Sequence, residues 1–157
     1  VPLRYDGEGF AWLRANELGS PAILEAVLPE YRWGSRFSVH TGLPAVVGWS
    51  WHVRQHRAAV PGSVVEKRIA EVEKFYRSRL AAPGEGSGEG RATVEEVRRL
   101  LARHRVRWIV DGLLERAVYG EEGLAKLGEL ERLGLLERAY TNPGLTLWRV
   151  LPDATAR

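Results

Sequence analysis

Two residue types are missing from this chain of 157 residues, which contains no cysteine and no methionine. The lack of cysteine excludes a disulfide scaffold, a thiolate zinc site and catalysis by a cysteine nucleophile, while it leaves the redox compartment open. The lack of methionine bears on how the chain begins, because natural chains start with that residue. We therefore expect Val1 to be a processed N-terminus or the first residue of a piece of a longer protein.

Long hydrophobic runs are missing as well. A helix that crosses a bilayer needs about 20 consecutive apolar residues, and the longest run here, from Leu43 to Trp51, is interrupted by a proline, a glycine and a serine. Asp6 and Glu8 lie where a signal peptide would have its apolar core, so no such peptide is expected. The sequence as given predicts no membrane-spanning segment.

Lysine is scarce, since only three of the 23 basic residues are lysines and the net charge is +3. The remaining basic residues are arginines, which keep their charge and offer a planar group that fits carboxylates and phosphates. The bias therefore suits ion-pair networks or anion binding. The GC-rich genome of a thermophile would give the same bias.

Hydrophobic periodicity and capping signals predict the helices. Ser63 and Thr93 are each followed by a glutamate three residues later, and this pattern forms a capping box at a helix start. Behind each box, apolar residues recur every three or four positions, as on the buried face of a helix. Similar stretches end at Gly19 and Gly134. We expect helices over 7–18, 63–80, 94–104 and 121–133.

Short apolar runs predict strands between these helices, over 21–28, 35–40, 44–49, 106–110, 135–140 and 145–150. Strands separated by helices indicate an α/β fold, a layered sandwich with a mostly parallel sheet flanked by helices. The turn at Asn142-Pro-Gly144 predicts that the last two strands form a C-terminal antiparallel hairpin. We expect one domain over 1–157, with a mobile glycine-rich loop at 83–91.

Three motifs suggest chemistry that their details do not support. The glycines of 84–90 lack the spacing of a phosphate-binding loop, and two glutamates among them would repel a phosphate. Gly48-Trp-Ser50-Trp-His52 has a histidine where a nucleophile elbow needs its second glycine. His52 and His56 have the spacing of a zinc protease, but Val53 replaces the glutamate that acts as its base. No catalytic residue, metal or cofactor is predicted.

A dense arginine cluster lies between Arg98 and Arg107. It could contact phosphates of a nucleic acid or of a lipid. Two glutamates lie one helical turn away, and no aromatic residues are interleaved with the arginines. The cluster is therefore interpreted as a solvated, ion-paired helix face, and no nucleic acid is expected as a partner.

Polar and aromatic side chains are densest between residues 31 and 57. Aromatic planes together with arginine, glutamine and hydroxyl donors are what a sugar or sugar-phosphate site needs. The alternative interpretation places the tryptophans in the core and pairs the arginines with Glu25 or Glu30. The sequence leaves both interpretations open.

An ordered series of short motifs extends over nearly the whole chain. In order, they are Pro21-Ala-Ile-Leu-Glu-Ala26, Tyr31, Arg36-Phe-Ser-Val-His-Thr-Gly-Leu-Pro44, Val47-Gly-Trp49, His52, Gln55, Arg57, Val106-Arg-Trp-Ile-Val110, Leu114-Glu-Arg-Ala117, Tyr119-Gly120, Gly123-Leu-Ala-Lys126, and Asn142-Pro-Gly144 through Val150. This series resembles the C-terminal region of the YYY family of large multi-pass membrane proteins.

The resemblance implies an extracytoplasmic domain that follows many transmembrane helices, in a protein that resembles C-type glycosyltransferases using lipid-phosphate sugars. In such enzymes the catalytic carboxylate usually lies in the membrane part, so this domain would assist rather than catalyse. Val53 and His56 depart from the pattern, which commonly has a glutamate and a tryptophan there. The residues that match family positions, and that the resemblance marks as candidate ligand-binding residues, are Glu25, Tyr31, Arg36, Ser38, Thr41, Gly42, Trp49, His52, Gln55, Arg57 and Glu115.

Three functional hypotheses follow. The first is a non-catalytic domain that binds carbohydrate or sugar phosphate, such as a polyprenyl-phosphate sugar, in a groove near Arg36, Thr41, His52 and Arg57. The second is an interaction module that docks on its own transmembrane domain, for which Trp33, Trp49 and Trp51 should be exposed together. The third, an autonomous hydrolase, requires a carboxylate such as Glu25 or Glu115 within reach of His40 or His52.

Overall fold

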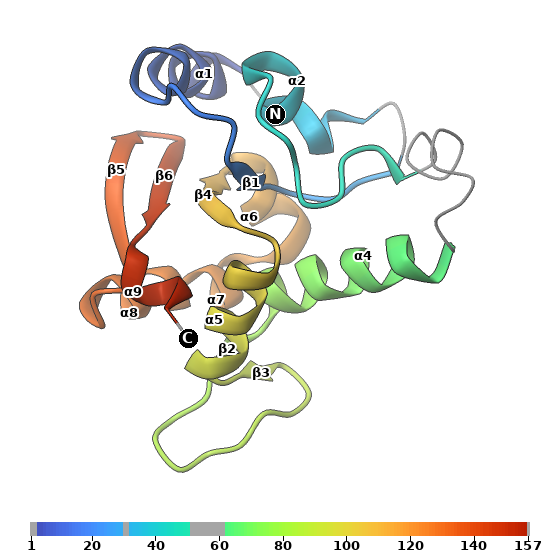
Figure 1. The fold of residues 1–157 in the computed structure, drawn as a ribbon, viewed down its shortest axis with the longest axis vertical. Helices are drawn as coiled ribbons and strands as arrows, with labels where there is room; N and C mark the ends of the chain where they lie inside the picture. The colour runs from blue at the N-terminus through green and yellow to red at the C-terminus, as the bar shows by residue number, and fades with distance from the viewer. Residues whose placement is uncertain (1–2, 30–31, 51–61, 157) are drawn as a thin grey trace.

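One four-stranded sheet organises the part of the chain that this computed structural model describes, residues 3–29, 32–50 and 62–156 (Figure 1). The first strand, β1, is short and lies at one edge, where it pairs in parallel with β4. Strand β4 pairs antiparallel with β6, which in turn pairs antiparallel with β5 at the other edge. In sheet order, the strands are β1 (Ala22–Leu24), β4 (Val106–Gly112), β6 (Leu145–Val150) and β5 (Leu136–Asn142).

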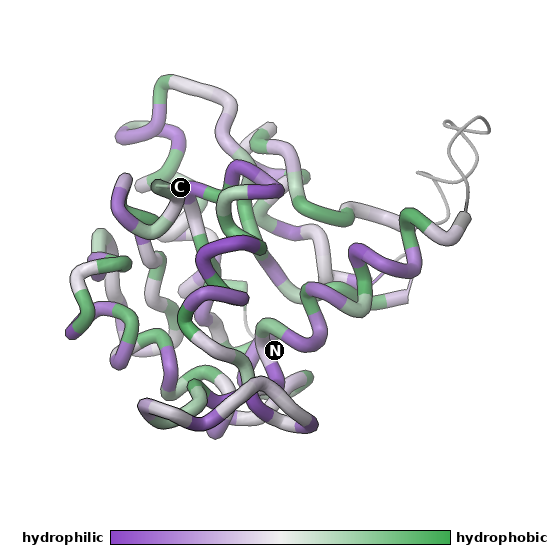
Figure 2. Tube along the Cα trace, turned by 60° about the horizontal axis from the view of Figure 1, so that its bottom comes forward, coloured by the Kyte–Doolittle hydropathy of each residue, from purple (hydrophilic) through white to green (hydrophobic). Residues whose placement is uncertain are grey.

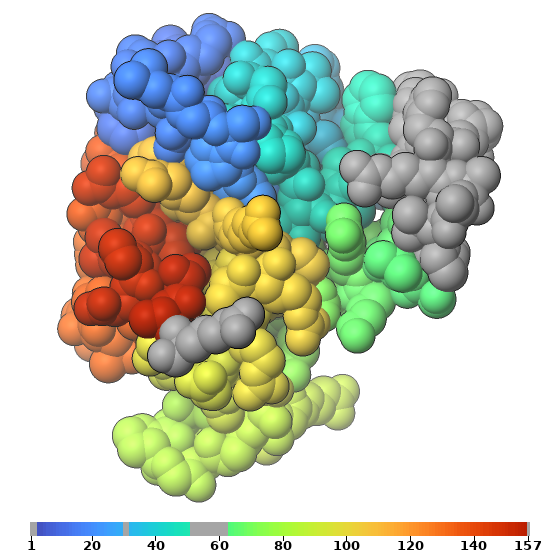
Figure 3. All heavy atoms as spheres, viewed as in Figure 1, coloured from blue at the N-terminus to red at the C-terminus, as the bar shows by residue number. Residues whose placement is uncertain are grey.

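Helices precede, connect and follow these strands. A second, two-stranded parallel pair, β2 (Arg79–Leu80) with β3 (Arg91–Ala92), flanks the glycine-rich segment, which extends from the body of the molecule in Figures 1 and 3. The helices are α1 (Arg4–Asn16), the 3-10 turn η1 (Trp33–Ser35), α2 (Arg36–Thr41), α4 (Gly62–Arg77), α5 (Val94–Arg103), α6 (Leu113–Tyr119), α7 (Glu121–Leu124), α8 (Lys126–Arg132) and α9 (Pro152–Thr155).

The core consists of two clusters of buried residues. One cluster joins Phe10 and Leu13 of α1 and Phe37 of α2 to the sheet. The other and larger cluster joins α4, α5, α7 and α8 to the sheet. Alternate strand residues supply the two clusters, as shown by Trp108 in the first and Ile109 in the second. Along α4, hydrophilic and hydrophobic residues alternate in Figure 2, as expected for a helix with one buried face.

The predicted mixed α/β composition and the C-terminal hairpin of β5 and β6 are confirmed. The mostly parallel sheet and the layered sandwich are not, because β1 with β4 is the single parallel pair in the four-stranded sheet of the described residues. The hairpin explains the difference. Its strand β6 inserts beside β4, so β4 has one parallel and one antiparallel neighbour.

The prediction of a strand over 35–40 is wrong. These residues form the end of η1 and the helix α2, which Gly42 terminates in the left-handed conformation at φ 77°. The alternation of polar and apolar residues suggested a strand, but the helix start is supported by a carboxylate from elsewhere in the chain, described below. The expected strand over 44–49 is also absent from the described residues, where Ala45 forms an isolated bridge to Ile23.

Other local predictions are confirmed with small changes of boundary. Thr93 and Glu96 form the predicted capping box of α5. Ser63 lies inside α4, which begins at Gly62. The predicted helix over 121–133 is divided into α7 and α8 at Ala125. Within the described ranges, no helix combines the length and the hydrophobicity needed to cross a bilayer.

Candidate functional site

Three of the predicted site residues, Glu25, Arg36 and Glu115, meet in one buried cluster with Asp6. The Arg36 guanidinium donates Nε to Asp6 Oδ2 at 2.9 Å and Nη2 to Glu115 Oε2 at 2.8 Å. A further bond joins Arg36 Nη1 to Glu115 Oε1 at 3.0 Å. Burial alone would lower the pKa of Arg36, but the two carboxylates raise it above its ordinary value. Arg36 is therefore a fixed cation between two carboxylates.

Glu115 also receives backbone donors from two strands. Its Oε1 accepts the amide of Ala26, just after β1, at 2.9 Å, and its Oε2 accepts the amide of Gly112, at the end of β4, at 3.1 Å. A Cβ at Gly112 would lie 2.8 Å from Arg36 Nη2. The glycine thus allows the backbone to approach the ion pair closely.

Glu25 supports the start of α2. Its Oε2 accepts the amide of Phe37 at 2.8 Å and its Oε1 accepts the amide of Ser38 at 3.0 Å. These are amides that a helix start leaves without a partner inside the helix. Burial raises the pKa of Glu25 to about 8, although the two amides and Arg36 act in the opposite direction. The residue is thus a buried helix cap.

Two tyrosines close the cluster on the side of α4 and α6. The Tyr76 hydroxyl lies 2.9 Å from the carbonyl oxygens of both Leu24 and Val110, in the neighbouring strands β1 and β4. Its ring stacks on that of Tyr119 with 4.8 Å between the centroids. Burial raises the pKa of both hydroxyls, that of Tyr119 to about 12.

This cluster has no surface for a ligand. Arg36 is 2% exposed and Glu115 is fully buried, and Asp6 and Glu25 are nearly as inaccessible. The geometry matches the part of the alternative interpretation in which an arginine pairs with carboxylates, and the partners of Arg36 are Asp6 and Glu115. Glu30, one of the partners named there, lies outside the described residues. Its effect is to join α1, β1, α2 and α6.

The other predicted site residues are not brought together around a common cavity. Thr41 uses its hydroxyl locally, donating to the carbonyl of Phe37 at 2.6 Å and accepting the amide of Leu43. Ser38 and Trp49 are half-buried, and Gly42 is exposed. The remaining four predicted residues, Tyr31, His52, Gln55 and Arg57, lie outside the described residues.

The hydrolase hypothesis gains no support from His40. Its ring stacks on Phe10 with 4.6 Å between the centroids, and in the described residues neither Glu25 nor Glu115 bonds to it. The histidine that does meet a carboxylate is His104, whose Nε2 lies 2.7 Å from Glu71 Oε2. Across the described residues, no group of three histidine or acidic side chains is placed to hold a metal ion.

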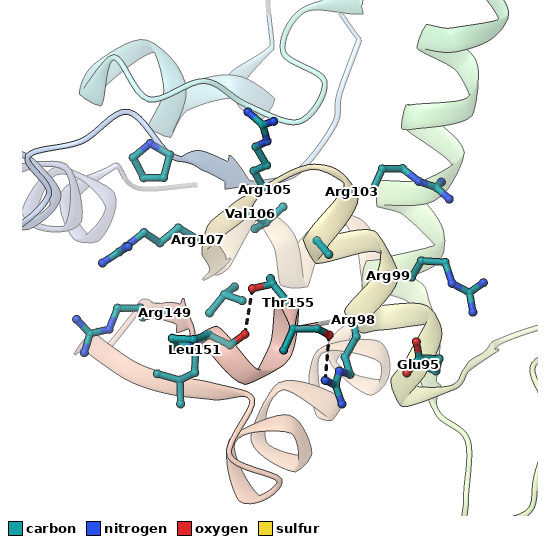
Figure 4. A pocket seen from close by; sticks show the side chains of 15 residues that line it. Glu95, Arg98, Arg99, Arg103, Arg105, Val106, Arg107, Arg149, Leu151 and Thr155 are labelled. Carbon is teal, nitrogen blue, oxygen red and sulfur yellow. Dashed lines mark hydrogen bonds between the residues drawn. The ribbon is translucent and has the colours of Figure 1, made fainter.

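A groove lies elsewhere, at the arginine cluster. It has a volume of about 1100 Å³ and lies where α5 and the start of β4 meet the end of β6 and α9 (Figure 4). Val106, Leu151 and Pro152 provide apolar lining. Figure 4 shows arginine side chains spread around these residues. The charged residues that line this arginine groove are Glu95, Arg98, Arg99, Arg103, Arg105, Arg107 and Arg149.

Backbone geometry fixes one of these arginines at the turn between α5 and β4. Arg105 has a φ of 52°, the single positive φ of a residue other than glycine in the described part of the chain. This left-handed conformation costs about 1 to 2 kcal/mol for a residue with a Cβ. The turn thus presents an arginine where glycine would be the favourable choice.

Sequence reasoning identified the arginines of 98–107 but interpreted them as a solvated face. The helix does carry ion pairs, since Arg103 binds Glu71. What the sequence did not show is the opposite wall of the groove, formed by Arg149 and residues 150–156. The signal available in the sequence was the density of arginines in 98–107. The structure adds that Glu95 is the glutamate that lines the same groove.

The chain was compared with protein-family models and with curated proteins. No protein-family model matches the chain, and no curated protein matches it.

Proposed function

We propose that this chain is a non-catalytic binding domain that holds a sugar phosphate in the arginine groove. The observation that carries the proposal is the lining of the groove, which contains six arginines and one glutamate. Guanidinium groups bind phosphate oxygens through paired hydrogen bonds, so this lining favours a phosphorylated ligand over a neutral one. The apolar residues between the arginines supply a surface for the ring of a sugar.

The size of the groove supports a ligand larger than a single phosphate. Sites for small molecules are commonly about 300 to 1000 Å³, and this groove has about 1100 Å³. A sugar phosphate, or the head of a polyprenyl-phosphate sugar, fits that range. We therefore place the candidate ligand site at the arginines around Arg105 and not at Arg36, which is buried and paired with carboxylates.

The cellular setting of the proposal comes from the sequence resemblance. The domain would lie on the extracytoplasmic side of a membrane-bound, glycosyltransferase-like protein. The catalytic carboxylate would belong to the membrane part, and the groove would hold the phosphorylated donor or acceptor beside it. The buried carboxylates Glu25 and Glu115 are engaged in structural bonds and take no part in this role.

A second candidate is an interaction module that docks on its own transmembrane domain. It is favoured by Trp33 in η1 and Val39 in α2, which are 58% and 60% exposed. Large apolar side chains on a surface often mark a site of contact with a protein or a membrane. Of the three tryptophans that this hypothesis expects to be exposed together, Trp33 is exposed, Trp49 is half-buried and Trp51 lies outside the described residues.

Titration of the 157-residue chain with glucose 1-phosphate, and separately with glucose, tests the first proposal. We expect amide chemical shifts of Val106 and Leu151 to move with the phosphate ester and not with the neutral sugar. Arg105→Gly should weaken binding about tenfold, the loss of about one charged hydrogen-bonding group. Its stability should change little, because glycine adopts the φ of 52° without strain.

The matched control is Arg132→Ala, which removes an exposed arginine of α8 that does not line the groove. It should bind glucose 1-phosphate like the unmodified chain. Equal shifts with glucose, or no shifts at millimolar ester, would contradict the proposal. If the ester gives no shifts and detergent micelles move the tryptophan emission to shorter wavelength, the docking module becomes the better account.

A further inference from the structure

The charges around the arginine groove indicate the charge of its ligand, an inference that rests on the proposed function. Half of the lining arginines already have a carboxylate partner in the folded chain, and each partner lies outside the groove lining. The pairs are Arg103 with Glu71 of α4, Arg107 with Glu17 after α1, at 3.2 Å, and Arg149 with Glu137 of β5.

These pairs have two effects on the groove. They neutralise three of its positive charges, and they fix the positions of the three side chains. Arg107 and Trp108, for example, both bind Glu17 Oε2, so the position of Arg107 is fixed from a neighbouring element. The remaining arginines are therefore the ones available to a ligand.

Three lining arginines, Arg98, Arg99 and Arg105, have no carboxylate partner in the described part of the chain. Arg98 donates to the carbonyl of Ala156 at 3.3 Å, a neutral acceptor that leaves its charge uncompensated. Arg99 and Arg105 are exposed. The one acidic lining residue, Glu95, forms no ion pair there either and offsets one positive charge. Two positive charges remain.

We infer that the arginine groove selects a dianionic phosphate, either a phosphomonoester or a pyrophosphate diester, over a monoanionic phosphodiester. A ligand with two negative charges neutralises the two uncompensated arginine charges. A phosphodiester has one negative charge and leaves one arginine charge without a partner. Of the three uncompensated arginines, Arg98 and Arg99 belong to α5 and Arg105 to the turn that follows it, so the excess positive charge is spread over this part of the groove.

The inference is tested by measuring dissociation constants of the 157-residue chain at pH 8 and constant ionic strength. Glucose 1-phosphate is the dianionic probe, and its methyl phosphodiester is the monoanionic probe with the same sugar. We expect about tenfold tighter binding of the dianion, the contribution of about one charge-assisted contact. Constant ionic strength is needed because exposed charges are screened by salt.

A second measurement distinguishes a phosphomonoester from a pyrophosphate diester as the preferred ligand. A phosphomonoester has a second pKa near 6 and becomes mostly monoanionic at pH 5, whereas dimethyl pyrophosphate keeps both charges. Binding of glucose 1-phosphate should therefore weaken towards the value of its methyl ester at pH 5. Binding of dimethyl pyrophosphate should not change. A pyrophosphate that binds more tightly than the monoester at pH 8 identifies the diester as the preferred ligand.

Variants of the charged groove residues test whether these residues cause the preference for a dianion. Arg99→Gln should reduce the ratio between dianion and monoanion binding to about one, and Glu95→Gln should strengthen binding of the dianion about threefold. Arg132→Ala should leave the ratio unchanged. If both probes bind equally and both depend on Arg105, the inference is overturned while the proposed function stands. If neither probe binds, both are overturned.

Discussion

At the scale of single residues, Glu25 shows two opposed effects on one carboxyl group. Burial disfavours the ionised form, whereas the amides of Phe37 and Ser38 and the nearby Arg36 favour it. Burial dominates and raises the pKa to about 8. Another buried group, Lys126, donates to the carbonyls of Phe75, Ser78 and Gly123, and burial lowers its pKa to about 7. Neither pKa shift could be predicted from the sequence, because both depend on burial in the folded chain.

Stability should therefore fall with rising pH because of Glu25. The folded chain keeps the proton up to about pH 8, while the unfolded chain loses it near 4.5. Between these values the folded state binds more protons, so each pH unit lowers the free energy of unfolding by about 1.4 kcal/mol. The expected measurement is urea unfolding at pH 5, 5.5 and 6, below the lowered pKa of Lys126, so that this lysine is protonated in both states.

The comparison for this prediction is Glu25→Gln, which has no proton to lose. The amide side chain cannot accept both backbone amides, so the variant should be less stable at every pH by about 1 to 3 kcal/mol. Its stability should nevertheless vary less with pH than that of the unmodified chain. Parallel pH profiles would show that Glu25 is already ionised at pH 5.

At the scale of secondary-structure elements, two helix starts differ in how their amides are satisfied. In α5 the cap is local, since Thr93 Oγ1 accepts the amide of Glu96 at 3.2 Å and Glu96 returns a bond to the amide of Thr93. In α2 the acceptor is Glu25, which lies twelve and thirteen residues before the amides it binds. A local cap is visible in a sequence pattern, whereas a distant one is not.

Thr93→Ala should lower the free energy of unfolding by about 1 kcal/mol, because the first turn of α5 loses its side-chain acceptor. Thr93→Ser keeps the hydroxyl and is the matched control, with a smaller expected loss. Chemical denaturation of the two variants measures the difference. Equal losses would mean that the methyl group of Thr93, and not its hydroxyl, supports the helix start.

This contrast explains which elements the sequence predicted. The capping box of α5, the apolar run of β4 and the turn at Asn142-Pro-Gly144 are local signals, and all three elements are present. The helix α2 was mistaken for a strand because its cap comes from Glu25. The mostly parallel sheet was not confirmed because the position of β6 beside β4 depends on contacts between distant parts of the chain.

At the scale of the whole molecule, the buried ion cluster and the arginine groove use arginine in opposite ways. Arg36 is enclosed by Asp6 and Glu115 and holds elements together. Arg105 is exposed at a turn and leaves its charge available. The resemblance selected Arg36 as a candidate ligand-binding residue, but only burial distinguishes the two roles. The second wall of the groove, from Arg149 onward, joins the first only after folding.

Arg36→Met should lower the free energy of unfolding by about 3 to 5 kcal/mol. The substitution leaves the carboxylates of Asp6 and Glu115 buried without their cation, which costs more than the ion pair itself contributes. Thermal or urea unfolding measures the loss. Arg132→Met, at an exposed position of α8, should change stability by less than about 0.5 kcal/mol. Similar effects of the two substitutions would contradict the role assigned to the cluster.

The contacts of the N-terminal segment also determine when it can fold. The amide of Ala26 donates to the carboxylate of Glu115, which lies 89 residues later in the chain. The amide of Val27 donates to the hydroxyl of Tyr119, which lies 92 residues later. Asn142 binds the backbone of Tyr5 across 137 residues. Such long loops are entropically costly to close and slow the folding of a chain. During synthesis from the N-terminus, α1, β1 and α2 must therefore remain without these C-terminal partners until most of the chain has been made.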